Sequence, residues 1–262
     1  MKKARTNNRV HVNRDLQLVE KIYDNENNYL RENAVLSFLC NTSITAPKIR
    51  NHYTIDNQHA IQMEILDGHP FKSHKHSPRE EIQIWSSIGK AIRLLHDETR
   101  GLDPELLGLE RRTIDTLLSL ARFLPEKLSL ATKLFILSSH QEKFDNHSIQ
   151  TLIHRDIRID NIFIKNDSDI VLLDYENSAV GYPWGDLVRL IGDDLKSKND
   201  NINALLTGYG VDHSEFWASY PILRLSYLLE MYNYVKLKGR QAEWTLGMHN
   251  VMLKEIKEIT KL

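Results

Sequence analysis

Short apolar runs separated by polar turn residues mark the middle of the chain. Residues 162–164 (Ile-Phe-Ile) and 170–173 (Ile-Val-Leu-Leu) are two such runs, and residues 165–168 (Lys-Asn-Asp-Ser) lie between them. Runs of this length, bounded by turn residues, are typical of buried strands joined by a hairpin. We therefore predict two paired strands here, preceded by a third apolar run at Leu152–Ile153.

The first quarter of the chain predicts further strands and one helix. The strands are expected at residues 9–12, 16–23, 50–55 and 59–66. The helix is expected at residues 26–40, where it ends at a run of three polar residues. Within the second strand Val19, Lys21 and Tyr23 share one face, because side chains alternate between the two faces of a strand.

Most of the remaining chain predicts helices. Ser77 is a suitable N-cap for a helix whose apolar stripe runs from Ile84 to Leu95. The further helices are expected at residues 105–147 with a break near Pro125, at 183–190 with Pro183 in the first turn, at 213–238 and at 241–260. Residues 193–203 are expected to form a polar loop.

Composition excludes several classes of protein and changes little else. The 262 residues are 41% hydrophobic and 26% charged, with a formal net charge of −1. Such a chain has no electrostatic reason to bind nucleic acid or a membrane surface. No apolar run approaches the roughly 20 residues of a membrane-spanning helix. Cys40 is the only cysteine, so no internal disulfide forms, and we expect a reducing, cytoplasmic location. Oligomeric state is left open.

Polar side chains gather where the central strands begin and end. Asp156 and Asn161 lie on the loop before the first strand of the hairpin, and Asp174 follows the second strand. The predicted hairpin brings all three to one end of a small sheet. Phosphoryl transfer needs such a set, because one Asp orients and deprotonates a hydroxyl while an Asn and a second Asp hold Mg²⁺ against phosphates.

These residues resemble two elements of the kinase fold. Residues 154–161 match the H-R-D-x-x-x-x-N catalytic loop, and Asp174-Tyr175-Glu176 stands where kinases have D-F-G. Residues 181–187 (Gly-Tyr-Pro-Trp-Gly-Asp-Leu) begin only seven residues after Asp174, which leaves no room for a protein kinase's activation loop. The chain therefore resembles the aminoglycoside phosphotransferase and choline kinase-like superfamily, and protein kinase activity is the less favoured reading.

The resemblance implies an α+β, protein-kinase-like fold with two lobes. Residues 1–68 would form a small, β-rich N-lobe with a nucleotide-facing sheet and one helix. Residues 69–262 would form a larger, mainly helical C-lobe with the catalytic loop and the acceptor site. The implied cofactors are ATP, or another nucleoside triphosphate, and Mg²⁺.

The resemblance also assigns roles to individual residues. The assigned catalytic residues are Asp156 as base, His154 as support of the loop and Arg158 as a positive charge near the transferring phosphate. Asn161 and Asp174 are assigned to Mg²⁺, Lys21 to the α- and β-phosphates, and the backbone of Glu64 and Leu66 to the purine edge. Glu32 is assigned to position Lys21, with Glu26 as its rival. Asp186 is assigned a structural role, tying the catalytic loop to a helix.

Two departures from the family pattern stand out. Arg155 follows the histidine where antibiotic kinases usually have Gly. None of the twenty residues before Lys21 is Gly, so the Gly-rich loop that covers the phosphates is not recognisable. Either the loop between Lys2 and Arg14 substitutes with other residues, or the small lobe is cut down. The second case motivates an alternative function, a pseudokinase-like nucleotide-binding or regulatory module without turnover.

The acceptor is expected to be a small molecule with a hydroxyl group, such as an aminoglycoside, choline, thiamine or a sugar. The late aromatic residues predict helical core packing first and, as the functional alternative, an aromatic wall for a cationic acceptor; they are Trp217, Tyr220, Tyr227, Tyr232, Tyr234 and Trp244. Its acidic partners could be Asp193, Asp194 or Glu230. His74 and His76 suggest a metal, but we expect a solvated loop there.

Overall fold

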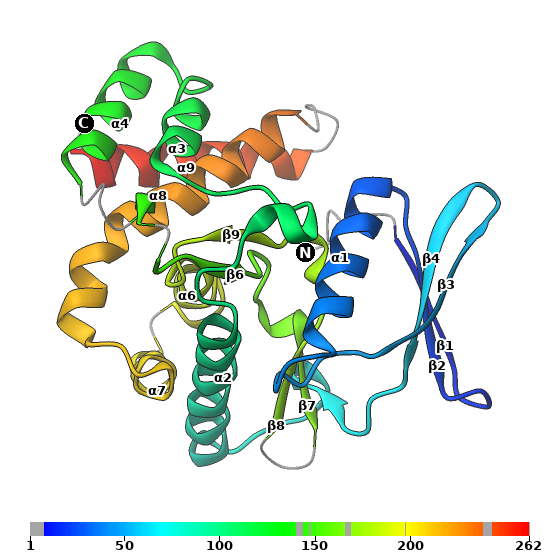
Figure 1. Cartoon of the computed structure of the whole chain (residues 1–262). Helices are drawn as coiled ribbons and strands as arrows, with labels where there is room; N and C mark the ends of the chain where they lie inside the picture. Colours follow the sequence, from blue (N-terminus) through cyan, green and yellow to red (C-terminus); the bar gives the residue numbers. More distant parts are fainter. Residues whose placement is uncertain are drawn as a thin grey trace.

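The computed structural model describes residues 8–139, 144–146, 148–165, 169–196, 198–237 and 243–261. The chain forms two lobes, a small one built on an antiparallel sheet and a larger one made mainly of helices (Figure 1). This is the protein-kinase-like α+β fold that the sequence predicts.

The small lobe contains a four-stranded sheet in the order β1-β2-β4-β3, and all neighbouring strands are antiparallel. The strands are β1 (Arg9–Asn13), β2 (Leu18–Ile22), β3 (Ile49–Ile55) and β4 (Gln58–Glu64). The four predicted strands are confirmed. The predicted loop between Lys2 and Arg14 lies partly outside the described residues, which begin at Asn8.

Helix α1 (Glu26–Leu39) lies between the sheet and the larger lobe (Figure 1). It begins after Asn25, whose side chain accepts hydrogen bonds from the N–H groups of Asn27 and Asn28 and so caps the first turn. Its buried residues recur at helical spacing; they are Tyr29, Glu32, Val35, Leu36 and Leu39. Glu32 is thus the one acidic side chain on an otherwise apolar face.

The strands of the larger lobe form two small sheets. The strands β5 (His69–Pro70), β7 (Ile162–Lys165) and β8 (Asp169–Leu172) pair in that order, and β6 (Thr151–Ile153) pairs with β9 (Ala179–Gly181). The predicted β7–β8 pairing is confirmed, while its turn residues 166–168 lie outside the described residues. We propose a lobe boundary at residue 68, because the chain leaves the large sheet after Glu64 and joins the β7 sheet at His69.

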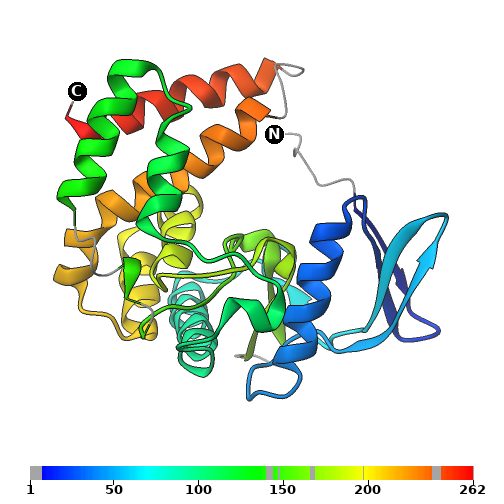
Figure 2. The same cartoon turned by 45° about the horizontal axis from the view of Figure 1, so that its top comes forward.

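The helices of the larger lobe follow. They are α2 (Pro78–Glu98), α3 (Ile114–Ala121), α4 (Glu126–Ser138), α6 (Gly185–Arg189), a π-helical stretch (Leu190–Leu195), α7 (Asn199–Tyr209), α8 (His213–Leu237) and α9 (Glu243–Thr260). Figure 2 shows α3, α4, α8 and α9 gathered on the side of the molecule away from the four-stranded sheet. None of the described helices is both long and apolar enough to cross a membrane.

The prediction of a polar loop at residues 193–203 is wrong. Asp193 and Asp194 lie in the π-helical stretch, and α7 begins at Asn199. The first turn of α7 is polar, but its buried side chains recur at helical spacing; they are Asn201, Ile202, Leu205, Leu206 and Tyr209. Helix α7 packs closely along α2, and this burial outweighs the polar start.

Two further predictions need correction. Residues 108–113 are not helical, because they run beside β9, where Arg112 N–H donates to Val180 O at 2.7 Å and Val180 N–H donates to Glu110 O at 3.0 Å. Pro183 lies before α6 and not in its first turn, since Gly185 N–H donates to Tyr182 O at 3.2 Å and closes a turn there.

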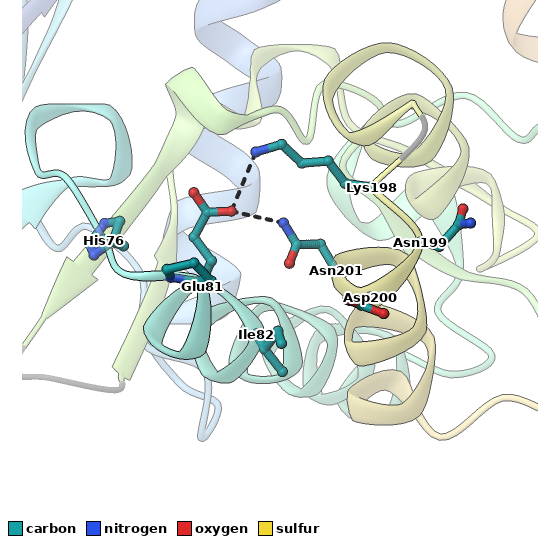
Figure 3. A pocket seen from close by; sticks show the side chains of 8 residues that line it. His76, Glu81, Ile82, Lys198, Asn199, Asp200 and Asn201 are labelled. Atoms are coloured by element: carbon teal, nitrogen blue, oxygen red, sulfur yellow. Dashed lines mark hydrogen bonds and ion pairs between the residues drawn. The ribbon is translucent and has the colours of Figure 1, made fainter.

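Glu81 joins the first turns of α2 and α7. Its Oε2 accepts from Asn201 Nδ2 at 2.9 Å and lies 3.3 Å from Lys198 Nζ (Figure 3). A carboxylate at the start of α7 is favourable, because the N–H groups of a first helical turn carry partial positive charge. A cavity of about 520 Å³ lies beside this contact, and none of the predicted site residues lines it.

Candidate active site

The hairpin brings the loop of residues 154–161, which is the predicted catalytic loop, to the end of β8. Strand β6 leads into His154, and a single 3₁₀ turn (Ile159–Asn161) leads from the loop into β7. Leu173 N–H donates to Asn161 O at 2.9 Å, one step beyond the paired residues Ile162 and Leu172. Asn161 and Asp174 therefore lie at the same end of the hairpin, as the sequence predicts.

Asp186 holds the backbone of the catalytic loop. Its carboxylate accepts from the N–H groups of His154 and Arg155, both at 2.7 Å, and lies 3.1 Å from His96 Nε2. Burial alone would raise the pKa of Asp186, but these hydrogen bonds and the neighbouring histidines hold it below its usual range. The contacts agree with the structural role expected for Asp186, while sequence reasoning missed His96.

Arg155 has a left-handed backbone, with φ of 64°. This conformation suits Gly best, which explains why a Gly is usual at this place in the family pattern. The guanidinium is instead anchored by Glu230 at 2.7 Å, Glu110 at 2.9 Å and the carbonyl of Asn177 at 3.1 Å.

His154 supports the loop as a neutral imidazole. Nε2 lies 3.0 Å from Leu173 O and donates to it, and Nδ1 accepts from Asp156 N–H at 3.3 Å. The ring also packs on Tyr175, with centroids 4.5 Å apart. Burial lowers the pKa of His154, so the proton arrangement that these bonds require is maintained at neutral pH.

Both carboxylate oxygens of Asp156 have partners. Oδ2 accepts from Asn161 Nδ2 at 3.2 Å, and Oδ1 forms an ion pair with Arg189 Nη1. Arg189 is the last residue of α6 and was missed by sequence reasoning. Arg158 lies on the same loop, where its closest ion-pair partner among the described residues is Asp160 at 3.7 Å.

Lys21 meets three carboxylates that come from two separate parts of the chain. Its Nζ lies 2.5 Å from Glu32, 2.6 Å from Asp174 and 3.2 Å from Glu176. Burial alone would lower the pKa of Lys21, but the three carboxylates outweigh it and raise the pKa. Glu26 is exposed and pairs with His59 instead, so the structure brings Glu32 and not its rival to Lys21.

The donor set near Asp174 fits Mg²⁺. Carboxylate oxygens of Glu32, Asp174 and Glu176 lie within 4.8 Å of one another, and Mg²⁺ prefers oxygen ligands. Asn161 uses its amide N–H on Asp156 O at 3.0 Å, which leaves its amide oxygen as a ligand atom. Among the described residues no other group, His74 and His76 included, brings three such ligand atoms together.

The predicted purine-binding segment leaves the large sheet at the end of β4. Glu64 N–H donates to Lys48 O at 3.0 Å and Ile65 N–H donates to Gln17 O at 3.1 Å. The sheet therefore fixes the backbone in an extended form up to Ile65, directly before Leu66. The Glu64 side chain points to Arg50, with which it forms an ion pair.

The acidic residues considered for the acceptor site each have a partner. Asp193 binds Arg224 at 3.0 Å, and Asp194 accepts from Ile159 N–H at 3.2 Å. Glu230 binds Arg155 and helps to line a small cavity with Tyr182 and Tyr227. The side chain of Trp244 lies outside the described residues.

Two comparisons with known proteins concern the sequence. The model of a family described as the phosphotransferase enzyme family matches residues 5–220. Among curated protein sequences, none matches the chain.

Three solved structures illustrate the likeness of fold. APH(2″)-IIia, bound to GDP and kanamycin, has a TM-score of 0.70 and 13% identity, covering 96% of this chain and 90% of that chain. The macrolide 2′-phosphotransferase MphH from Brachybacterium faecium has a TM-score of 0.62 and 15% identity, covering 91% and 84%. APH(3″)-Id from Streptomyces rimosus, bound to ADP and streptomycin, has a TM-score of 0.56 and 18% identity, covering 82% and 90%. At these identities the likeness establishes the fold.

Proposed function

This chain belongs to the phosphotransferase enzyme family and is a small-molecule kinase, and from that premise we propose that it phosphorylates a hydroxyl group with Asp156 as the base. The phosphate donor is ATP or another nucleoside triphosphate, together with Mg²⁺. The related folds APH(2″)-IIia and APH(3″)-Id were solved with GDP and kanamycin and with ADP and streptomycin. Those complexes support a nucleotide donor and a small acceptor.

The observation that supports this proposal most is the contact of Lys21 with both Glu32 and Asp174. These residues come from a strand, a helix and the end of the catalytic hairpin. A Lys held by a helix Glu next to a metal-binding Asp is the arrangement that kinases use to hold nucleotide phosphates. We assign Lys21 to the α- and β-phosphates, and the Glu64 carbonyl and Leu66 N–H to the purine.

The proposed reaction is an in-line displacement at the γ-phosphorus. The acceptor oxygen forms a bond to phosphorus while the bond from phosphorus to the β-phosphate oxygen breaks, and Asp156 receives the hydroxyl proton. Arg158 balances charge on the transferring group, and His154 keeps the loop in place. When bound by Asn161 and Asp174, Mg²⁺ supplies positive charge to the phosphates.

The test of this proposal is Asp156→Ala, measured as ATP consumption against a panel of hydroxyl compounds with and without Mg²⁺. We expect kcat to fall about a thousandfold or more, with nucleotide binding retained. Asp169→Asn, which changes an exposed carboxylate at the start of β8, is the matched control and should keep full turnover.

Two outcomes would contradict the proposal in different ways. Turnover retained by the Asp156→Ala variant would exclude Asp156 as the base. Absence of any Mg²⁺-dependent nucleotide binding by the unchanged protein would favour the pseudokinase-like alternative.

A further inference from the structure

A guanidinium group lies beside the proposed catalytic base. Arg189 pairs with Oδ1 of Asp156, and Asn161 donates to Oδ2. A hydroxyl that gives its proton to Asp156 must approach to about 3 Å. If Asp156 is the base, as proposed above, then the acceptor must lie next to Arg189. The positive charge of Arg189 therefore decides which acceptors fit.

Three cations gather around this loop. Lys72 lies 2.7 Å from Asp160 and Arg158 lies 3.7 Å from the same carboxylate, so two cations share Asp160. Arg189, which pairs with Asp156, is the third cation. Asp194 lies behind the loop, where its carboxylate accepts from Ile159 N–H at 3.2 Å.

The acidic residues that could bind a cationic acceptor already have internal partners. Asp193 contacts Arg224 at 3.0 Å and the hydroxyl of Tyr227 at 2.5 Å. Glu230 contacts Arg155 at 2.7 Å and lies 3.6 Å from Arg112. A polycation would have to displace these internal partners before it could pair with either carboxylate.

The aromatic residues considered for the acceptor site also have internal partners. The guanidinium of Arg224 lies over Tyr227, 5.1 Å from its centroid. Tyr232 stacks on His249 at 4.4 Å, and Tyr220 packs on Trp217 at 5.1 Å. These side chains pack on internal cations and on other rings, so they do not form a prepared cation-binding wall.

We infer that the acceptor carries an anionic group, a carboxylate or a phosphate ester, in addition to its hydroxyl, and that Arg189 binds this group. A guanidinium presents a planar pair of donors that matches both anions. Pairing with the acceptor also draws Arg189 away from Asp156, which leaves Oδ1 open to the hydroxyl. Arg189 is thus a specificity-determining residue.

The test compares anionic acceptors with their neutral and cationic counterparts. The full chain with ATP and Mg²⁺ is assayed with glycerate and sn-glycerol 3-phosphate against glycerol, with gluconate and glucose 6-phosphate against glucose, and with choline and kanamycin. We expect turnover with an anionic member and a KM for that acceptor raised about tenfold or more by Arg189→Gln, equivalent to one lost charged contact. The KM for ATP should not change.

Two variants separate specificity from structure. Arg189→Lys keeps the charge and should restore most of the acceptor affinity. Arg100→Gln, which removes an exposed guanidinium paired with Asp97, is the matched control and should leave every KM unchanged. Melting temperatures of all variants show whether they are folded.

Several outcomes would overturn the inference and leave the proposed function standing. One is a neutral or cationic compound with a higher kcat/KM than every anionic member of the panel. Another is an anionic acceptor whose KM is unchanged in Arg189→Gln. A third is a protein that binds ATP and Mg²⁺ but neither binds nor phosphorylates any anionic probe. Failure to bind nucleotide at all would instead overturn the proposed function.

Discussion

At the scale of single residues, two buried bases respond in opposite ways to burial. Lys21 keeps its charge because Glu32, Asp174 and Glu176 surround its ammonium group. His154 has hydrogen bonds to a carbonyl and to an N–H group instead, so burial dominates and lowers its pKa. The number of carboxylates in direct contact decides which protonation state the fold retains.

The neutral state of His154 predicts a loss of stability in mild acid. Its pKa in the folded protein lies below the ordinary value of 6.5. Below pH 6.5 the unfolded chain therefore binds a proton that the folded protein does not, and unfolding is favoured as pH falls. The free energy of unfolding falls by up to about 1.4 kcal/mol for each pH unit, until the pH drops below the pKa of His154 in the folded protein.

The measurement is the free energy of unfolding between pH 7.5 and 5.5. His154→Gln should be less stable than the unchanged protein at pH 7.5 but should show a shallower decline with acid. His52→Gln changes an exposed histidine and should keep the original slope. Equal slopes in all three proteins would show that His154 does not carry the effect.

Sequence reasoning identified the residues that lie together in one recognisable motif. It missed the residues that contact this motif from elsewhere in the chain. His154, Asn161 and Asp174 lie within one short stretch, and its local pairing brings them together. Arg189 and His96 reach Asp156 and Asp186 from other helices. Their contacts depend on how α2 and α6 pack in three dimensions, which one sequence does not reveal.

At the scale of elements, α2 and α7 cross with almost no space between their backbones. A Cβ atom on Gly208 would overlap the carbonyl of Ser86 and lie 2.7 Å from its carbon. A Cβ on Gly89 would overlap the carbonyl of Leu205 and lie 2.6 Å from Tyr209 N. Since these neighbours are backbone atoms, they cannot move aside without separating the two helices.

We therefore expect Gly208→Ala to destabilise the protein by about 2 kcal/mol or more, as overpacked sites do. Gly247→Ala is the control, because a Cβ at Gly247 in α9 meets nothing within 4 Å. There the better helix propensity of Ala should stabilise by about 0.5–1 kcal/mol. Urea denaturation measures both changes, and destabilisation of equal size at both positions would exclude the close-crossing argument.

The same crossing explains why sequence reasoning missed the start of α7. Residues 199–201 are Asn-Asp-Asn, and such residues favour turns when nothing packs against them. Glu81 binds Asn201 and Lys198, and the apolar side chains from Ile202 onward pack in the core. The first turn of α7 is therefore held by contacts with another helix, Asn201 itself being buried, and such contacts are not visible in the sequence.

At the scale of the whole molecule, the two lobes are joined through the proposed metal-binding segment. Lys21 of β2 contacts Asp174, Tyr175 N–H donates to Glu32 at 3.2 Å, and Arg31 donates to the carbonyl of Glu176 at 2.6 Å. Residue types alone suggested the Lys–Glu pair, but the contact of Arg31 depends on how α1 sits against the larger lobe. Residues 174–176 thus connect the proposed nucleotide site to α1.

This connection predicts that nucleotide and Mg²⁺ stabilise the fold together and that Asp174 carries the metal-dependent part. At a nucleotide concentration about 100 times its Kd, binding adds about 2.7 kcal/mol to the free energy of unfolding, which for a chain of this size raises Tm by about 5 °C or more.

Asp174→Asn should keep the Tm of the nucleotide-free protein nearly unchanged. The lost attraction to Lys21 is offset by relief of repulsion from Glu32 and Glu176, whose carboxylate oxygens lie within 4.8 Å of that of Asp174. The variant should gain little from added Mg²⁺, and EDTA should reduce the unchanged protein to the same level. A full Mg²⁺-dependent increase in the variant would move the metal to the remaining carboxylates, Glu32 and Glu176, and remove Asp174 from the proposed site.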